Sequence, residues 1–337
     1  GRTASTGSVF GQRQHPEFYK AQAMRLPVWN KPRIIGCAEN FPQHIALPRG
    51  CLDDVRTLLQ DNGIELVLHD ERFAGEPIDV RFAGTLRPDQ EAALEGMLVH
   101  DTGILCAPTA FGKTVTAAAL IARRGVNTLV LVHRTELLQQ WKERLQAFLG
   151  ADKTKVGTIG GGKAKPTGII DIAVMQSLSR QGEVSEQVKN YGQIIVDECH
   201  HLSAFSFEAL LKAASAKYVL GLTATPIRRD GQQPIIFMQC GPIRHTASRP
   251  ESAPADLAVT PLWLSRPIVM PEGTGIQDVF LQVCNDTERT AKVVAEVGEA
   301  FDQGRKILVL TERTDHLSAI EEQLVGRVEN LFTLHGR

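Results

Sequence analysis

Two short stretches of the sequence carry residue types that could hold phosphate groups together with a metal ion. The first, residues 107–114, reads APTAFGKT and follows a short apolar run. A loop between a strand and a helix points backbone N–H groups at phosphate oxygens, and the helix N-terminus favours negative charge. In such a loop a lysine reaches the β- and γ-phosphates, and the next hydroxyl binds Mg²⁺. We therefore predict a phosphate-binding loop made of Ala107, Pro108, Thr109, Ala110, Phe111, Gly112, Lys113, Thr114 and Val115.

Two positions in this loop depart from the usual G-x-x-x-x-G-K-[ST] pattern. Ala107 stands at the first glycine, and Ala110 occupies a middle position that is often glycine. Alanine tolerates a positive φ less well than glycine, so Ala110 is expected to stiffen or reshape the loop slightly. Taken alone, the stretch could also be an ordinary strand–turn–helix that carries a surface lysine.

The second stretch, residues 193–201, reads QIIVDECHH and ends an apolar run in two acids. The carboxyl end of a parallel strand is where open α/β sheets bind ligands. There Asp197 would hold Mg²⁺, and Glu198 would orient and deprotonate an attacking water. Two solvated acids are the simpler interpretation of this stretch alone. The phosphate loop upstream favours the catalytic interpretation, and the sequence has no second ligand pair to make zinc ligands of Cys199, His200 and His201.

Apolar runs of strand length alternate with amphipathic runs of helix length from residue 85 onward, and this alternation predicts the elements that position both stretches. Short, nearly all-apolar strands between helices indicate a parallel sheet covered on both faces, so the fold class is α/β. The strands are expected at residues 104–107, 128–132, 169–174, 193–196 and 218–222, and helices at 113–124, 135–149 and 205–214.

The chain is expected to have four parts. They are an N-terminal accessory α+β segment (1–85), an ATP-binding domain (86–245), a linker (246–275) and the start of a second α/β domain (276–337). The accessory segment should contain a helix at 52–60 and strands at 64–69 and 78–82. After the Pro- and Ser-rich connector at 246–256 we expect a strand at 258–264, one long helix at 276–301, a strand at 306–310, a helix at 315–325 and a strand at 331–334.

Composition narrows the class of protein. The net charge is −1, so any nucleic-acid contact must come from local patches and backbone amides. The six cysteines are scattered without C-x-x-C spacing, which argues against a disulfide framework and indicates a reducing, cytoplasmic setting. No apolar run approaches the roughly 20 residues that span a bilayer.

Further strings stand in a recognisable order: LRPDQ at 86–90, VHRTELLQQW at 132–141, DECH at 197–200 and LTATP at 222–226. With the phosphate loop, they resemble superfamily 2 helicases of the XPB/UvsW/type III restriction-like group. The resemblance runs from 86 to about 243, and more weakly over 304–337. It implies RecA-like domains, ATP and Mg²⁺ as cofactors, and nucleic acid, in particular DNA, as partner. The family's motifs V and VI do not occur in these 337 residues, so this stretch by itself is expected to hydrolyse ATP weakly.

The resemblance also assigns roles to individual residues. Gln90 would read the adenine edge with Arg87 near the base, although Pro88 in the first turn also fits a plain helix start. Lys113, Asp197 and Glu198 would be catalytic, with Thr114 and Asp197 holding Mg²⁺. Contacts to nucleic acid, or coupling to the ATP site, are implied for Arg134, Thr135, Gln176, Ser177, His200, Thr223, Thr225, Arg228, Arg229 and Asp230.

Three functions remain open at this point: an ATP-dependent helicase, a restriction-type translocase that moves along duplex without separating strands, and an ATP-gated clamp with little turnover. A transporter ATPase or a kinase is disfavoured by TATP at 223–226 and by the Asp-Glu-x-His string. Residues 17–51 resemble the segment before the helicase in primase–helicase proteins of TOTE conflict systems. That resemblance implies a primase domain in the same parent chain.

Overall fold

The computed structural model describes residues 12–14, 16–24, 34–150, 154–180, 183–199, 204–225, 233–248, 259–263, 271 and 273–335. The chain forms two compact units, Gly1–Ala253 and Pro254–Arg337. The first contains the sheet, and the second is helical in its described part. No helix among the described residues is long and apolar enough to cross a membrane. The four-part division expected from the sequence stays a prediction.

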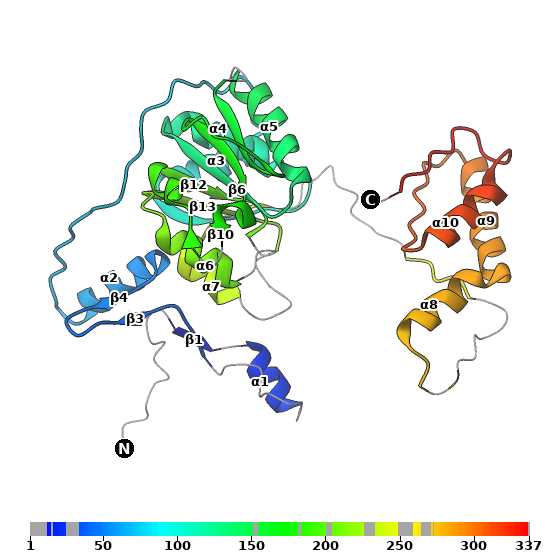
Figure 1. Ribbon diagram of the computed structural model, residues 1–337, viewed down its shortest axis with the longest axis horizontal. Coiled ribbons are helices and arrows are strands. Elements are labelled where there is room, and N and C mark those ends of the chain that lie inside the picture. The colour runs from blue at the N-terminus through cyan, green and yellow to red at the C-terminus, as the bar shows by residue number, and fades with distance from the viewer. Residues whose placement is uncertain are drawn as a thin grey trace. The chain divides into compact units, whose positions relative to one another are not determined.

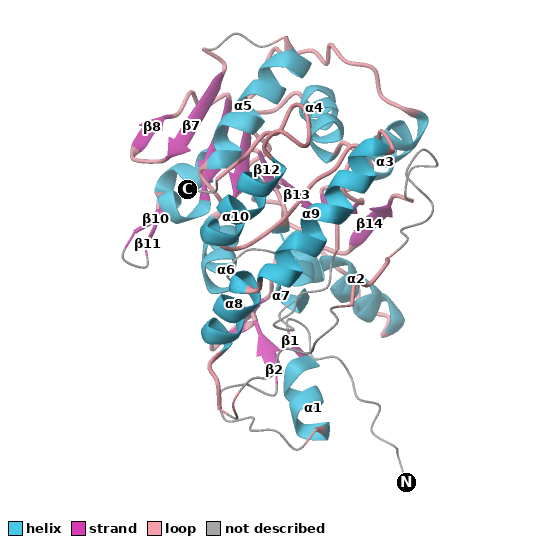
Figure 2. Cartoon of the chain, turned by 90° about the vertical axis from the view of Figure 1, so that its right-hand side faces the viewer, coloured by secondary structure: helices cyan, strands magenta, loops and turns pink. Residues whose placement is uncertain are grey.

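An eight-stranded sheet organises the first unit, in the order β14-β5-β13-β12-β6-β9-β7-β8. Neighbouring strands are parallel except for β7 and β8, which form an antiparallel hairpin at one edge (Figure 2). Every residue of β6, β9 and β12 is buried, as strands covered on both faces require. The strands are β5 (Thr102–Cys106), β6 (Thr128–Val132), β7 (Val156–Gly160), β8 (Lys163–Lys165), β9 (Ile170–Val174), β12 (Gln193–Val196), β13 (Tyr218–Thr223) and β14 (Ile243–Thr246).

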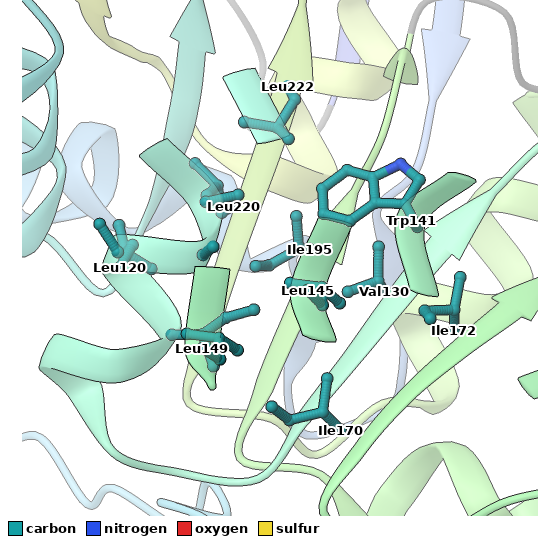
Figure 3. Packing of buried hydrophobic residues seen from close by; sticks show 14 of the residues in the cluster. Leu120, Val130, Trp141, Leu145, Leu149, Ile170, Ile172, Ile195, Leu220 and Leu222 are labelled. Atoms are coloured by element: carbon teal, nitrogen blue, oxygen red, sulfur yellow. The ribbon is translucent and has the colours of Figure 1, made fainter. Parts of the chain in front are cut away.

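Helices pack on both faces of this sheet, which confirms the predicted α/β class (Figure 1). Alternate strand residues enter two separate cores: Leu129 and Leu131 pack with one set of helices, and Val130 and Val132 with the other. Figure 3 shows the second core, in which the α5 side chains lie over the strands. The first face carries α6 (Ala204–Ala213) and α7 (Gln233–Cys240), and the second carries α3 (Pro88–Leu98), α4 (Lys113–Arg124) and α5 (Glu136–Leu149).

Smaller elements lie before and beside the sheet. Two short antiparallel ladders, β1–β2 and β3–β4, and two helices form the N-terminal α+β part that the sequence predicts. A third ladder, β10–β11, follows a 3-10 turn. The bounds are β1 (Gln12–Gln14), α1 (Pro16–Ala23), β2 (Ile34–Gly36), β3 (Glu39–Asn40), β4 (Ile45–Ala46), α2 (Leu52–Asp61), β10 (Ser179–Arg180) and β11 (Glu183–Val184).

Two strand predictions in the accessory segment are wrong. Residues 64–69 form no ladder, and Ile64, Val67 and Leu68 are exposed. Residues 78–82 lie against the α4–β6 connection through the Ile78 N–H bond to the Gly125 carbonyl, which holds the run without a ladder. Strand-like composition therefore did not determine whether these runs pair with another strand.

The second unit contains three described helices: α8 (Ile276–Asn285), α9 (Thr287–Asp302) and α10 (Thr314–Leu324). The prediction of one helix over 276–301 is wrong, because Asp286 interrupts it and its side chain accepts a hydrogen bond of 3.0 Å from the N–H of Arg289, capping α9. The strands predicted at 306–310 and 331–334 are also wrong. Neither run joins a ladder in the described residues, and Leu308 and Leu334 are exposed. Residues 259–263, the described part of the run 258–264, likewise form no strand.

Arg49 attaches the accessory segment to the body of the first unit. Its guanidinium donates to the carbonyls of Ala216, Leu211 and Ala214 at 2.8, 3.0 and 2.6 Å, at the end of α6. Beside it, a Cβ on Gly50 would lie 2.2 Å from the Phe237 carbonyl oxygen, so the two backbones approach as closely as glycine permits. The arginine therefore satisfies carbonyls that a helix C-terminus leaves open.

Replacing Arg49 with alanine is expected to lower the free energy of unfolding by about 2–4 kcal/mol, because a charged, partly buried donor to three carbonyls is lost. Urea denaturation measures this value. The matched control is Arg56→Ala: the Arg56 side chain is 50% exposed and its contact with Asp53 is 3.9 Å long, so its removal should change stability by less than about 0.5 kcal/mol. Equal effects of the two substitutions would contradict the anchoring role of Arg49.

Candidate nucleotide-binding site

The loop at residues 107–112 joins β5 to α4, as the phosphate-loop prediction requires. Gly112 is the N-cap of α4 and has a φ of 92°, a conformation that favours glycine. A Cβ there would also lie 2.5 Å from the Gln90 amide nitrogen. Ala110 has a φ of 67°, so it occupies the left-handed region at a cost of about 1–3 kcal/mol. The loop thus keeps its strained shape with alanine at the middle position.

Lys113 and Glu198 meet at the carboxyl edge of the sheet. The Lys113 Nζ lies 3.2 Å from Glu198 Oε1, and it donates to the Ala107 carbonyl oxygen at 3.2 Å. The two side chains are 11% and 27% exposed, so the pair is largely withdrawn from water yet reachable. Glu198 has a φ of 45°, a left-handed conformation that is uncommon for a side chain of this size. The structure therefore brings together a cation and an acid that are 85 positions apart in the numbering.

Asp197 is 9% exposed and follows the last residue of β12. Its N–H donates to the Leu131 carbonyl at 2.9 Å, and its Oδ2 accepts a bond of 2.7 Å from the Trp141 indole N–H. Burial raises the pKa of the Asp197 carboxyl above its ordinary value, and the negative charge of Glu198 raises it further. The Trp141 hydrogen bond and the positive charge of Lys113 lower this pKa, but by less than burial raises it. A desolvated carboxylate of this kind is suited to bind a cation.

The hydroxyl of Thr114, in the first turn of α4, is the second oxygen that could bind a metal. It accepts a hydrogen bond of 3.2 Å from the Arg144 guanidinium of α5. A hydroxyl and a carboxylate are the hard oxygen ligands that Mg²⁺ prefers. The donor set of Thr114 and Asp197 therefore fits Mg²⁺.

Gln90 braces the phosphate loop from α3. Its amide donates to the Phe111 carbonyl at 2.7 Å, and its Oε1 accepts from the Arg87 N–H at 3.0 Å. The Arg87 guanidinium also donates to the Phe111 carbonyl, at 2.7 Å. Both predicted adenine-site residues therefore contact the loop itself, and their contact with a base stays a prediction.

Thr223 ends β13 next to the start of the phosphate loop. Its carbonyl accepts a 2.9 Å bond from the Ala107 N–H, and its hydroxyl, fully buried, donates to the Thr225 carbonyl at 2.7 Å. The TATP string thus shares backbone contacts with the loop, which suits the coupling role that the resemblance implies. That role itself stays a prediction.

The candidate nucleic-acid contacts gather at the same carboxyl edge. Arg134 and Thr135 follow β6, Gln176 and Ser177 follow β9, and all four are exposed. Because β6 and β9 are parallel neighbours, their ends meet. His200, Arg228, Arg229 and Asp230 lie outside the described residues.

Two contacts at the site were not anticipated from the sequence, those of Trp141 and Arg144. The string VHRTELLQQW includes Trp141, but its resemblance to a nucleic-acid motif implies roles for Arg134 and Thr135 and none for the tryptophan. A signal did exist: a buried tryptophan needs a partner for its N–H, and an amphipathic helix placed beside two acid-bearing strand ends could supply one. Arg144 is exposed and carries no such signal.

A parallel sheet with a phosphate loop after β5 and an Asp-Glu pair after β12 defines a RecA-like P-loop ATPase domain. Residues 83–228 match the family described as "Type III restriction enzyme, res subunit". This match and the XPB relatives described next support the resemblance to superfamily 2 helicases of the XPB/type III restriction-like group.

Curated relatives share this segment. The chain is 34% identical over 168 residues to "DNA 3'-5' translocase XPB2" of Sulfurisphaera tokodaii, covering 50% of this chain and 37% of the relative. It is 33% identical over 178 residues to "DNA 3'-5' helicase XPB" of Mycobacterium tuberculosis, covering 51% of this chain and 32% of the relative. The chain therefore spans well under two thirds of these proteins.

Among solved structures, the UvsW helicase from bacteriophage T4 has the same fold, with a TM-score of 0.51 at 18% identity. The similarity covers 70% of this chain and 90% of that one. At this identity the likeness concerns the fold alone.

Replacing Gln90 with alanine is expected to weaken nucleotide binding about tenfold, because its hydrogen bond to the Phe111 carbonyl of the phosphate loop and the bond it accepts from the Arg87 N–H are both lost at a 3%-exposed position. Equilibrium binding of a fluorescent ATP analogue measures this change. Gln187→Ala removes an exposed glutamine elsewhere in the unit and should leave the affinity unchanged. An unaltered affinity in Gln90→Ala would contradict the bracing role.

Proposed function

We propose that the protein is an ATP-dependent DNA helicase or translocase, in which this chain supplies the ATP-binding motor domain. The observation that carries the proposal is the 3.2 Å approach of Lys113 Nζ to Glu198 Oε1 at the edge where the phosphate loop ends. A phosphate-binding cation and an acid able to activate water are the two groups that hydrolysis of a terminal phosphate needs at one point. The names of the XPB relatives support DNA as the partner.

In this proposal Lys113 leaves its contact with Glu198 and binds the β- and γ-phosphates, while the loop N–H groups and the N-terminus of α4 hold the remaining oxygens. Glu198 is then free to accept the proton of the attacking water. Thr114 and Asp197 would hold Mg²⁺, which neutralises phosphate charge when bound.

Exposed polar groups at the same edge support the nucleic-acid side of the proposal. Arg134 and Thr135 precede α5, and an exposed helix N-terminus with a basic neighbour suits backbone phosphates. Contacts of this kind carry no base information, so the proposed motor acts without sequence preference from these residues. A primase domain in the same parent chain stays a prediction.

The test is ATP hydrolysis by the full-length protein, measured without nucleic acid and with single- and double-stranded DNA and RNA. We expect DNA to stimulate hydrolysis at least tenfold. Strand displacement would then identify a helicase, and displacement of a triplex strand without duplex separation would identify a restriction-type translocase. ATP-dependent DNA binding without stimulated turnover would favour an ATP-gated clamp. No nucleotide binding at all would contradict the proposal.

A further inference from the structure

Helix α5 reaches both candidate metal ligands from one side of the site. Trp141 and Arg144 are separated by three positions and therefore lie on one face of the helix. The indole N–H of Trp141 donates to Asp197 at 2.7 Å, and the Arg144 guanidinium donates to the Thr114 hydroxyl at 3.2 Å. The carboxylate that ends β12 and the hydroxyl in the first turn of α4 are thus both held by the same helix.

The contact made by Trp141 is the stronger of the two. The side chain is 2% exposed and packs in the core with Leu145 and Leu149, so the ring cannot turn without disturbing the core. Figure 3 shows the indole nitrogen on the side of the ring away from these two leucines. The bond to the buried Asp197 carboxyl is short, at 2.7 Å, and it holds one of the two carboxyl oxygens, which leaves the other oxygen to bind a ligand.

The hydrogen bond from Trp141 would also affect how Asp197 binds a metal ion. Groups that bond to a metal ligand from behind orient it, and their removal commonly lowers metal affinity 10- to 100-fold. The Trp141 N–H donates to Asp197, so removal of this donor acts first on the metal side of the site. Arg144 is exposed, and its bond to Thr114 is one that water can replace.

We propose that Trp141 is a positioning residue that holds Asp197 in the orientation required to bind Mg²⁺. This inference rests on the proposed function, because it takes Asp197 as a magnesium ligand. It assigns Trp141 a role in the ATP site rather than only in the core, and it makes α5, which begins beside the candidate nucleic-acid contacts, a structural part of that site.

The experiment compares the affinity for a fluorescent, non-hydrolysable ATP analogue in Mg²⁺ and in EDTA, measured by anisotropy on the full-length protein. In Trp141→Phe, which keeps an aromatic ring but lacks the N–H, we expect the affinity in Mg²⁺ to fall about tenfold and the affinity in EDTA to stay within twofold. Replacement of Trp141 by benzothienylalanine keeps the ring volume, removes only the donor, and should show the same pattern.

Ile170→Val is the matched control, because it removes one buried methylene from the same core, at the start of β9, without touching α5 or a candidate ligand. Its affinities should match the wild type in both conditions. Losses of equal size in Mg²⁺ and EDTA, or an unchanged benzothienylalanine variant, would overturn the inference and leave the proposed function standing. A wild-type protein whose nucleotide affinity ignores Mg²⁺ would overturn both.

Discussion

Lys113→Ala is expected to reduce DNA-stimulated ATP hydrolysis by at least about a hundredfold, because it removes the positive charge that the phosphate loop directs at the triphosphate. The Lys113 side chain is 11% exposed and lies 3.2 Å from both Glu198 and the Ala107 carbonyl, so its charge is held at the start of the loop. The same change should weaken nucleotide binding. Steady-state kinetics and analogue binding on the full-length protein measure the two effects.

Lys189→Ala is a suitable control for this variant. Lys189 also pairs with a glutamate, Glu186, at 2.7 Å, but the lysine is 46% exposed and belongs to a surface turn. Its removal should leave hydrolysis within about twofold of wild type. Wild-type hydrolysis by Lys113→Ala would show that the cation is dispensable, and the phosphate-loop interpretation would fail.

Glu198→Gln is expected to separate nucleotide binding from hydrolysis. The amide keeps the size of the side chain and can still contact Lys113, but it cannot accept a proton from water, so kcat should fall by about 10²–10⁴ while nucleotide affinity stays within about threefold. Single-turnover hydrolysis and equilibrium binding give the two quantities. The left-handed backbone of Glu198, with a φ of 45°, would be unchanged and would continue to aim the side chain at the site.

Glu95→Gln serves as the comparison for this second variant, because Glu95 pairs with Arg123 at 2.9 Å on the surface and both side chains are more than half exposed. Its kinetics should equal those of the wild type. A Glu198→Gln protein that hydrolyses ATP at the normal rate would exclude Glu198 as the group that activates water.

Five strands and three helices of the sheet domain were predictable because each is a single periodic run. The predicted helix at 113–124 matches α4, and the predicted strand at 128–132 matches β6. Residues that end a helix also make its boundary predictable. Gly125 has a φ of 63° and ends α4 where the apolar pattern stops. The all-apolar strands identified a sheet buried on both faces before any pairing was known.

Predictions failed where the outcome depends on a partner distant in the sequence. Residues 64–69 and 306–310 have strand composition, yet a strand exists only as part of a ladder, and the described residues provide neither run with one. The β7–β8 hairpin is the converse case. It is short, and Lys163 and Lys165 are exposed, so its apolar signal is weak although its pairing is real.

The order of the residues establishes which chemical groups are present and which element each of them follows: the phosphate loop, the Asp-Glu pair and the TATP string each follow an apolar strand. A parallel sheet collects such strand ends at one edge, so the meeting of Lys113 with Glu198 follows from local patterns and one rule of topology. The hydrogen bond from the Trp141 N–H to Asp197, 56 positions away, follows from no such pattern. That contact depends on how α5 is rotated against the sheet, and the packing of side chains such as Leu145 and Leu149 determines this rotation, while hydrophobic periodicity identifies only the buried face.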